Sequence, residues 1–351
     1  MLSTLLLGCP KGSPAPVDWA ATPQLPSPSA GTYSRVQAKP TDRGVQHALG
    51  GRAWDASLGG TAAGLALSLV TQPGTLTPQE VREAAWRAGW PFPLRSVHSA
   101  WGPTMAPPPP SMQEHIRNVP ANVDLGLVRA RGDQQDVWVL VTSQPKVDLG
   151  SIPRQLALGS VMRLPAVGPG TTFTAASPTG EVSEGHLELG WSTETNIAGE
   201  WLIEIREGTT RVALFPVYVG VPPPTLSLLP TGEAPQNGAV AERRAKDLLT
   251  QVREAYNLNP PGEDPMLQGA VPWAMANATG TTAPEIARRV GVDASDLWRL
   301  DCRAATVEAC LDQILWDPAA RPALLANRVW WGAGATVNSD GVRMLLILSR
   351  N

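Results

Sequence analysis

The sequence predicts an α+β protein in which two copies of one small helix-and-sheet domain flank an antiparallel β-sandwich. Two observations lead to this prediction. The same ordered signals occur twice, in residues 41–148 and 241–351, and short strands separated by turns fill residues 149–224 between them. The length of 351 residues and the hydrophobic fraction of 43% leave room for a buried core in each of these parts.

Two helices are expected to begin in the same way in each copy. An Asp-x-x-Leu-x-Gly motif, starting at Asp55 and at Asp264, opens an Ala-rich stretch, and Asp is a favoured N-cap residue. A Thr-x-x-Glu capping box with a proline in the first turn follows, at Thr77 and at Thr282. Each capping box predicts a second, amphipathic helix that ends near a glycine.

Each copy is expected to end in a β-hairpin whose first strand carries a glycine, Gly126 or Gly332. In both copies polar turn residues lie between two β-rich runs, a pattern typical of a hairpin. The separation between the capping threonine and this glycine differs by only one residue between the copies. This agreement favours an internal duplication.

The central segment, residues 149–224, is expected to form an immunoglobulin-like β-sandwich. Its β-rich runs lie at 171–174, 185–189, 201–205 and 211–219 and alternate with Gly- and Pro-containing turns. A run of prolines at 222–224 ends this pattern, and residues 225–240 are expected to be a linker to the last domain.

The N-terminal segment resembles a bacterial lipoprotein signal. Leu6-Leu7-Gly8-Cys9 is similar to the lipobox, in which cleavage precedes a lipid-carrying cysteine, and the apolar run is too short to span a bilayer. The resemblance implies a signal at residues 1–9 and an exported lipoprotein, anchored through Cys9 at the periplasmic face or the cell surface. Residues 10–40, rich in Pro, Ser and Ala, are expected to be a tether. No Lys or Arg precedes the apolar run, so a chance Leu-rich terminus and a freely secreted protein stay open as alternatives.

The other two cysteines, Cys302 and Cys310, are expected to form a local disulfide in an oxidising compartment. A metal site is the alternative for this pair. No histidine follows His186, and two thiolates do not supply the four ligands of a structural zinc site. We therefore expect neither a bound metal nor a cofactor.

The second copy resembles the CAP (SCP-like) superfamily. Its segment 264–267 is similar to the start of the family's first helix, and its segment 316–325 is similar to the Ser-Pro-x-His-Arg-x-x-Leu-Leu segment before the hairpin. The resemblance implies an α-β-α sandwich with a groove of two histidines and two acidic residues, which can hold a divalent metal. Ala320 stands where the family has a groove histidine, and the second copy contains no histidine. A methyl group cannot replace an imidazole as ligand, acid or base, so the resemblance is to degenerate copies.

Histidines and tryptophans provide the candidates for a binding surface. Histidines of the first copy are by default surface residues, and tryptophans at one-turn spacing are by default core residues. An indole cluster beside a Pro-rich loop is also typical of surfaces that bind carbohydrate or peptide. The candidate surface consists of His98, His115, Trp86, Trp90, Trp101 and Arg321.

Charge and motifs restrict the function. The net charge is −3, and its 28 basic and 31 acidic residues form no long blocks, which argues against a nucleic-acid partner. We find neither a nucleophile with a paired base nor a phosphate-binding glycine loop in the sequence. The sequence therefore predicts a non-catalytic envelope lipoprotein, not an enzyme, that binds an envelope protein or a glycan. The alternative is a hydrolase of cell-wall peptide or glycan with a rearranged site around His98 and His115.

Overall fold

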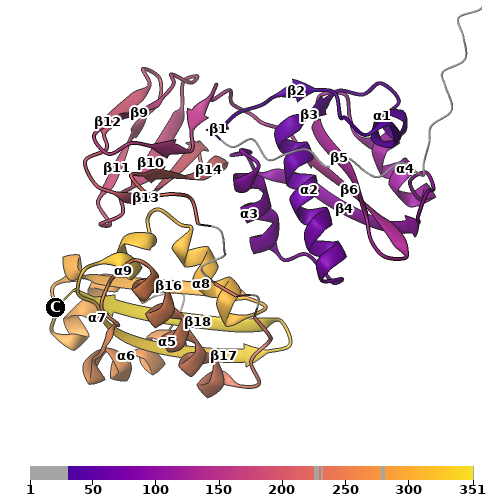
Figure 1. Cartoon of the computed structure of the whole chain (residues 1–351). Coiled ribbons are helices and arrows are strands. Elements are labelled where there is room, and N and C mark those ends of the chain that lie inside the picture. Colours follow the sequence, from indigo (N-terminus) through magenta and orange to yellow (C-terminus); the bar gives the residue numbers. More distant parts are fainter. Residues whose placement is uncertain (1–30, 225–228, 231, 278–280, 351) are drawn as a thin grey trace, which may run out of the picture.

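The computed structural model describes residues 31–224, 229–230, 232–277 and 281–350. Figure 1 shows two units of helices and sheet and, beside the first of them, a body made of strands. This composition confirms the predicted mixed α+β class. Cys9 and most of the predicted tether lie outside the described residues. Among the helices of the described ranges, none combines the length and the apolar character needed to cross a membrane.

The first unit (residues 43–143) is a three-stranded antiparallel sheet with helices on both faces. Its elements, preceded by the strand β2 (Gln37–Ala38) that pairs with β3, are α1 (Arg43–Leu49), β3 (Trp54–Asp55), α2 (Ala56–Thr71), α3 (Pro78–Arg87), β4 (Leu94–Pro103), α4 (Pro110–Asn118), β5 (Asp124–Arg131) and β6 (Gln135–Ser143). The strand order is β4-β6-β5. Alternate side chains of the central strand divide the two faces. Val139 and Val141 join the apolar cluster that contains α2 and α3, whereas Trp138 and Leu140 join the cluster that contains α1 and α4.

The second unit (residues 238–349) repeats this connectivity. Its elements are α5 (Gly238–Ala255), β15 (Gly262–Glu263), α6 (Pro265–Ala276), α7 (Ala283–Val290), β16 (Leu297–Ala304), α8 (Val307–Leu315), α9 (Arg321–Leu325), β17 (Trp330–Asn338) and β18 (Gly341–Ser349). The strand order, β16-β18-β17, matches that of the first unit, and β15 adds to the β17 edge. Leu345 and Ile347 face α6 and α7, whereas Leu346 and Leu348 face the layer of α5, α8 and α9.

The helix starts form as the sequence predicts. Asp55 and Asp264 each accept two backbone N–H groups of the helix that follows, α2 or α6. The backbone N–H of Thr77 and that of Thr282 each donate to the glutamate three residues later, at 2.7 Å in both units. These caps fix where α2, α3, α6 and α7 begin.

The glycine in the hairpin strand of each unit permits a close approach between helix and sheet. A Cβ atom on Gly126 would lie 2.2 Å from the carbonyl carbon of Leu58 in α2. A Cβ atom on Gly332 would lie 2.6 Å from the carbonyl carbon of Leu267 in α6. Any side chain would force the helix away from the sheet, so the glycine is required in both units.

The sandwich (residues 155–219) consists of two sheets. Its strands are β8 (Gln155–Leu156), β9 (Val161–Leu164), β10 (Thr171–Ala176), β11 (Val182–His186), β12 (Trp191–Glu194), β13 (Gly199–Glu207) and β14 (Thr210–Val219). A five-stranded sheet of order β11-β10-β13-β14-β8 accompanies the pair β12-β9. The rings of Phe173 and Trp191, one from each sheet, are 4.7 Å apart and join the sheets.

Two segments that were expected to be linkers contain regular structure. Residues 31–40 belong to the predicted tether, yet β1 (Thr32–Tyr33) pairs with β7 (Ile152–Pro153). Tyr33 is buried, and its hydroxyl donates to the carbonyl of Pro216 at 2.8 Å. Helix α5 begins at Gly238, inside the predicted linker, because Asn237 caps it. The average composition of a segment does not reveal the effect of one buried aromatic residue such as Tyr33 or one helix cap such as Asn237.

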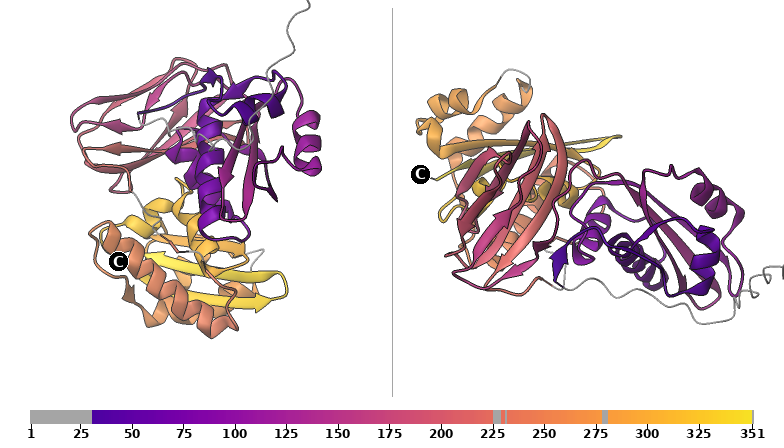
Figure 2. Two further views of the ribbon diagram at one scale, coloured as in Figure 1. Left: turned by 45° about the vertical axis from the view of Figure 1, so that its right-hand side comes forward. Right: turned by 90° about the horizontal axis from the view of Figure 1, so that it is seen from above.

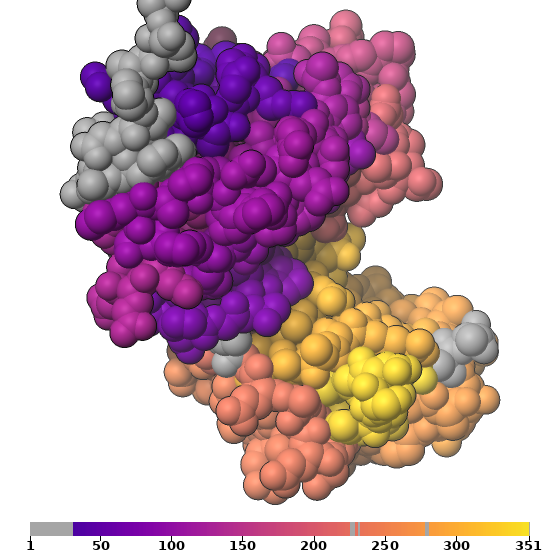
Figure 3. All heavy atoms as spheres, turned by 90° about the vertical axis from the view of Figure 1, so that its right-hand side faces the viewer, coloured from indigo at the N-terminus to yellow at the C-terminus, as the bar shows by residue number. Residues whose placement is uncertain are grey.

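The two units touch each other through different helical layers. The first unit contributes α3, from its α2/α3 layer, and the second contributes α8, from its α5/α8/α9 layer. Figure 2 shows the sandwich beside the first unit, and Figure 3 shows the second unit below the first unit. One apolar cluster therefore runs through all three bodies.

Candidate functional site

The structure brings His98 of β4 and His115 of α4 together. Their rings are stacked, with centroids 3.8 Å apart and an interplanar angle of 16°. They line a pocket of about 140 Å³ together with Arg95, Ser96 and Thr142. Burial, together with the neighbouring charge of His115, lowers the pKa of His98 below its ordinary value.

This pocket contains an uncharged imidazole, but its serine is paired with a threonine and not with a base. A neutral His98 can accept a proton or a hydrogen bond at neutral pH. The hydroxyl of Ser96 pairs with that of Thr142 at 2.7 Å, so the pocket serine is engaged with another hydroxyl. Within the described residues, no three His, Cys, Asp or Glu side chains form a group suited to a metal ion.

Two of the predicted surface tryptophans are buried, which corrects that expectation. Trp90 is 0% exposed and packs on Phe92. Trp86 donates its ring N–H to the carbonyl of Leu214 in the sandwich at 2.6 Å. Trp101, 38% exposed, does lie at the surface. Trp86 lies in the last turn of α3, whereas Trp90 follows the left-handed backbone at Gly89 beyond the helix end, and both indoles are buried.

Arg321 is also buried, contrary to its predicted place on a binding surface. Its Nη2 donates to Glu200 of the sandwich at 2.6 Å and to the hydroxyl of Tyr256 at 2.9 Å. Burial lowers the pKa of Arg321, but Tyr256 and Glu200 outweigh this effect and the pKa is raised. The guanidinium thus stays charged and holds the sandwich against the second unit.

The segment that resembles the family's groove segment lies in this interface. Ala320 packs against the shared apolar cluster, and Arg321 follows it directly. On the sandwich side, a Cβ atom on Gly180 would lie 3.3 Å from the Cα atom of Pro322. The sandwich therefore covers Arg321 and Pro322, whereas Ala320 is half-buried and Ala319 is exposed.

The first unit covers the adjoining helix α8. Arg82 of α3 forms a two-pronged ion pair with Asp312, at 2.7 Å and 2.5 Å. The same guanidinium lies 5.0 Å from the ring centre of Trp86 and 5.4 Å from that of Trp316. The two indoles meet edge to face at 4.5 Å. The contact is thus both charged and aromatic.

Cys302 and Cys310 form the expected disulfide, which ties α8 to β16. Their Cα atoms are 5.6 Å apart, and both residues are buried. In the first unit the corresponding helix and strand, α4 and β4, meet through His98 and His115. The same contact is thus covalent in one unit and made by stacked rings in the other.

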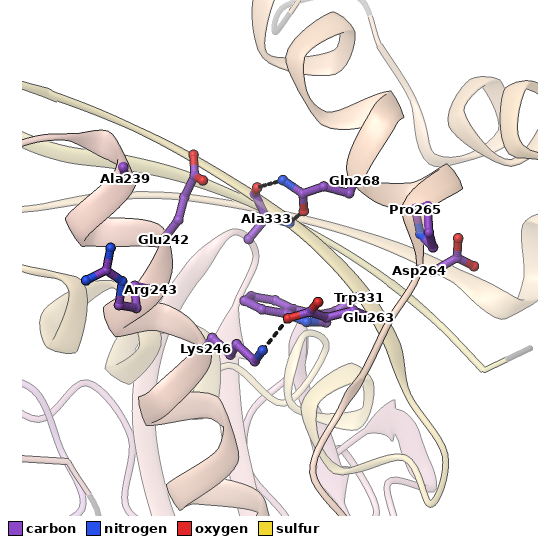
Figure 4. A pocket seen from close by; sticks show the side chains of 10 residues that line it. All are labelled: Ala239, Glu242, Arg243, Lys246, Glu263, Asp264, Pro265, Gln268, Trp331 and Ala333. Atoms are coloured by element: carbon purple, nitrogen blue, oxygen red, sulfur yellow. Dashed lines mark hydrogen bonds and ion pairs between the residues drawn. The ribbon is translucent and has the colours of Figure 1, made fainter.

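A cavity that was not singled out from the sequence lies on the second unit (Figure 4). It measures about 500 Å³ and lies between α5, β15, the start of α6 and β17. Trp331 lines it, and an ion pair between Lys246 and Glu263 crosses it. The carboxamide of Gln268 binds both backbone groups of Ala333, each at 2.9 Å. The adjacent tryptophans at 330 and 331 were the sequence signal nearest to it.

Comparison with known proteins gives no match for this chain among family models, curated proteins or solved structures.

Proposed function

We propose that the chain is a non-catalytic cell-envelope lipoprotein with a binding or structural role, built from two degenerate CAP-like domains and an immunoglobulin-like sandwich. Two sheets with helices on both faces support the α-β-α sandwich that the resemblance implies. The observation that carries the proposal is the burial of Arg321 beside Ala320. Under this proposal, the groove that the resemblance implies is replaced by a contact of Arg321 with Glu200 of the sandwich, which Tyr256 of the second unit supports.

This interface favours a scaffold over a catalyst. Removing one charge of a buried ion pair leaves the other uncompensated, which is strongly destabilising. Arg321 and Glu200 therefore have a structural role in holding the sandwich against the second unit. The ion pair between Arg82 of the first unit and Asp312 of α8 is a second structural contact on the same helical layer. We therefore expect the second unit to bind its partner, an envelope protein or a glycan, through its remaining exposed surfaces. A nucleic-acid partner is not part of the proposal.

Lipid attachment at Cys9 is the part of the proposal that places the protein at the membrane. The test is metabolic labelling of the full chain with palmitate, followed by separation of membranes from soluble protein. We expect label in the membrane fraction and its loss in Cys9→Ala. Ser13→Ala, in the same segment, is the matched control and should keep the label. An unlabelled wild-type chain would refute the anchor.

The second candidate function is a hydrolase of cell-wall peptide or glycan, which the stacked His98 and His115 favour. The full chain is incubated with peptidoglycan fragments, with and without zinc or calcium, and product release and melting temperature are followed. Under the non-catalytic proposal we expect no product and no metal-linked rise in melting temperature. Turnover that is lost in His115→Ala but kept in His186→Ala would establish the hydrolase instead.

A further inference from the structure

Because the fold is repeated, corresponding residues of the two units can be compared. Gly126 and Gly332 approach the same carbonyl position of their helices, Leu58 and Leu267. This contact sets a register in which each residue of β3 and early α2 has a counterpart in β15 and early α6. Differences between counterparts then show what one unit contains and the other lacks.

In the first unit, an indole fills the space between β3, α2 and β5. Trp54 immediately precedes the cap residue Asp55 and is 4% exposed. Its ring lies over Gly59, where a Cβ atom would be 2.0 Å from the indole Cζ2. Its ring N–H donates to the carbonyl of Leu127 at 3.2 Å. The first unit thus has an aromatic ring with its donor satisfied at this place.

In the second unit the counterparts differ, and the cavity of Figure 4 lies there. Glu263 stands in place of the indole, is exposed and pairs with Lys246. Gln268 stands in place of the glycine, and its Nε2 donates to the carbonyl of Ala333 at 2.9 Å. This carbonyl is the counterpart of the one that receives the first unit's indole N–H. The amide therefore makes the indole's hydrogen bond without filling the indole's volume.

The cavity wall also offers an aromatic surface. Trp331 is 6% exposed and lines the cavity. Its buried Nε1 has no hydrogen-bond partner among the described residues. A second indole can also pack against Trp331 in the offset or edge-on geometry that aromatic pairs prefer.

The adjoining strand edge indicates that the ring belongs to a polypeptide. β15 pairs with β17 only at Trp330 and Trp331. Beyond them, the carboxamide of Gln268 binds both the N–H and the carbonyl of Ala333, as a peptide group of a neighbouring strand would. The next N–H along this edge, that of Ala335, donates to Glu242 of α5 at 3.1 Å, so an extended chain pairs with the edge when these two side chains move aside.

We propose that this cavity binds a tryptophan side chain of an extended partner polypeptide, whose ring N–H donates to the carbonyl of Ala333 in place of Gln268. The inference rests on the proposed binding role of the protein. It deepens that role by naming the chemistry of the partner.

The first experiment titrates the full chain with N-acetyl-L-tryptophanamide by calorimetry and ligand-observed NMR. We expect saturable binding, with N-acetyl-L-leucinamide weaker by about tenfold or more. Equal affinity for the two amides would overturn the proposal. Binding of free indole without binding of the tryptophan amide would overturn its assignment to a polypeptide.

The second experiment rebuilds the first unit's arrangement in the second. Glu263→Trp combined with Gln268→Gly places an indole in the cavity, and we expect affinity for the tryptophan amide to fall by about tenfold or more. Glu254→Gln, at an exposed position of α5 outside the cavity lining, removes the same charge as a control and should keep the affinity. An unchanged affinity in the folded double variant, checked by its melting curve, would contradict the proposed site.

Failure of this inference is separable from failure of the proposed function. Palmitate labelling and membrane association depend on Cys9, not on the cavity. A labelled, membrane-bound chain that ignores the tryptophan amide would overturn the cavity assignment alone. An unlabelled chain that binds the amide would overturn the anchoring and leave the cavity assignment standing.

Discussion

His98 lies where burial and a neighbouring imidazole act in the same direction. Burial disfavours the charged ring, and protonated His115 repels a second proton at a centroid distance of 3.8 Å. A lowered pKa in the folded state means that the folded protein binds fewer protons than the unfolded chain near the ordinary histidine pKa. The stability that neutral His98 contributes is therefore present above the ordinary histidine pKa and is lost as the pH falls below it through the lowered pKa of the folded state.

We predict that His115→Asn raises the pKa of His98 toward, but not up to, its ordinary value. Removal of the neighbouring charge cancels one cause of the shift, whereas burial, the larger cause, remains. NMR titration of the imidazole signals measures this shift. His186→Asn, in the sandwich, is the control and should leave His98 unchanged. A His98 pKa that does not respond to His115→Asn would contradict the stacked arrangement.

At the scale of elements, the close contact of helix with sheet is the most restrictive feature of both units. We predict that Gly126→Ala and Gly332→Ala each lower the free energy of unfolding by about 2 kcal/mol or more, because the new methyl group meets helix backbone. Chemical denaturation measures the change. Gly269→Ala, in α6, has no neighbour within 4 Å of the new Cβ atom and should be neutral or stabilising. Equal effects at all three glycines would refute this explanation.

Local signals in the sequence predicted two capped helices and a closing hairpin in each unit, but not the first helix, the edge strand β4 or β16, or the helix that follows it. Asp55 and Thr77 begin their helices through hydrogen bonds within a few residues, so their effect is visible in a short stretch of sequence. The burial of Tyr33 and of Arg321 could not be predicted in this way. Each depends on a partner in another body, Pro216 or Glu200, more than a hundred positions away.

The candidate sites also differ in how far the sequence predicts them. His98 and His115 were both named from the sequence, although their stacking required the sheet register to be known. The cavity at Gln268 was not found, because a cavity is defined by missing volume and not by a residue type. Comparison of Gln268 with Gly59, and of Glu263 with Trp54, becomes meaningful only after the two folds are aligned.

At the scale of the whole molecule, the buried Arg321–Glu200 pair joins two bodies. We predict that Glu200→Gln lowers the free energy of unfolding by about 3 kcal/mol, because a buried guanidinium then lacks its counter-charge. Thermal and chemical denaturation of the full chain measure this loss. Glu207→Gln, at an exposed end of the same strand, should change little. A Glu200→Gln variant as stable as the wild type would show that the pair does not hold the interface.

The two units meet through unlike layers, α3 on one and α8 on the other. A contact of this type is heterologous, and its repetition from chain to chain would build a ring or an open filament. In the register of the capping threonines, however, the second unit has Ala287 of α7 and the cap residue Gly291 where α3 has Arg82 and Trp86. The second unit consequently cannot offer a neighbour the same ion pair and indole. Divergence between the copies confines this contact to one per chain.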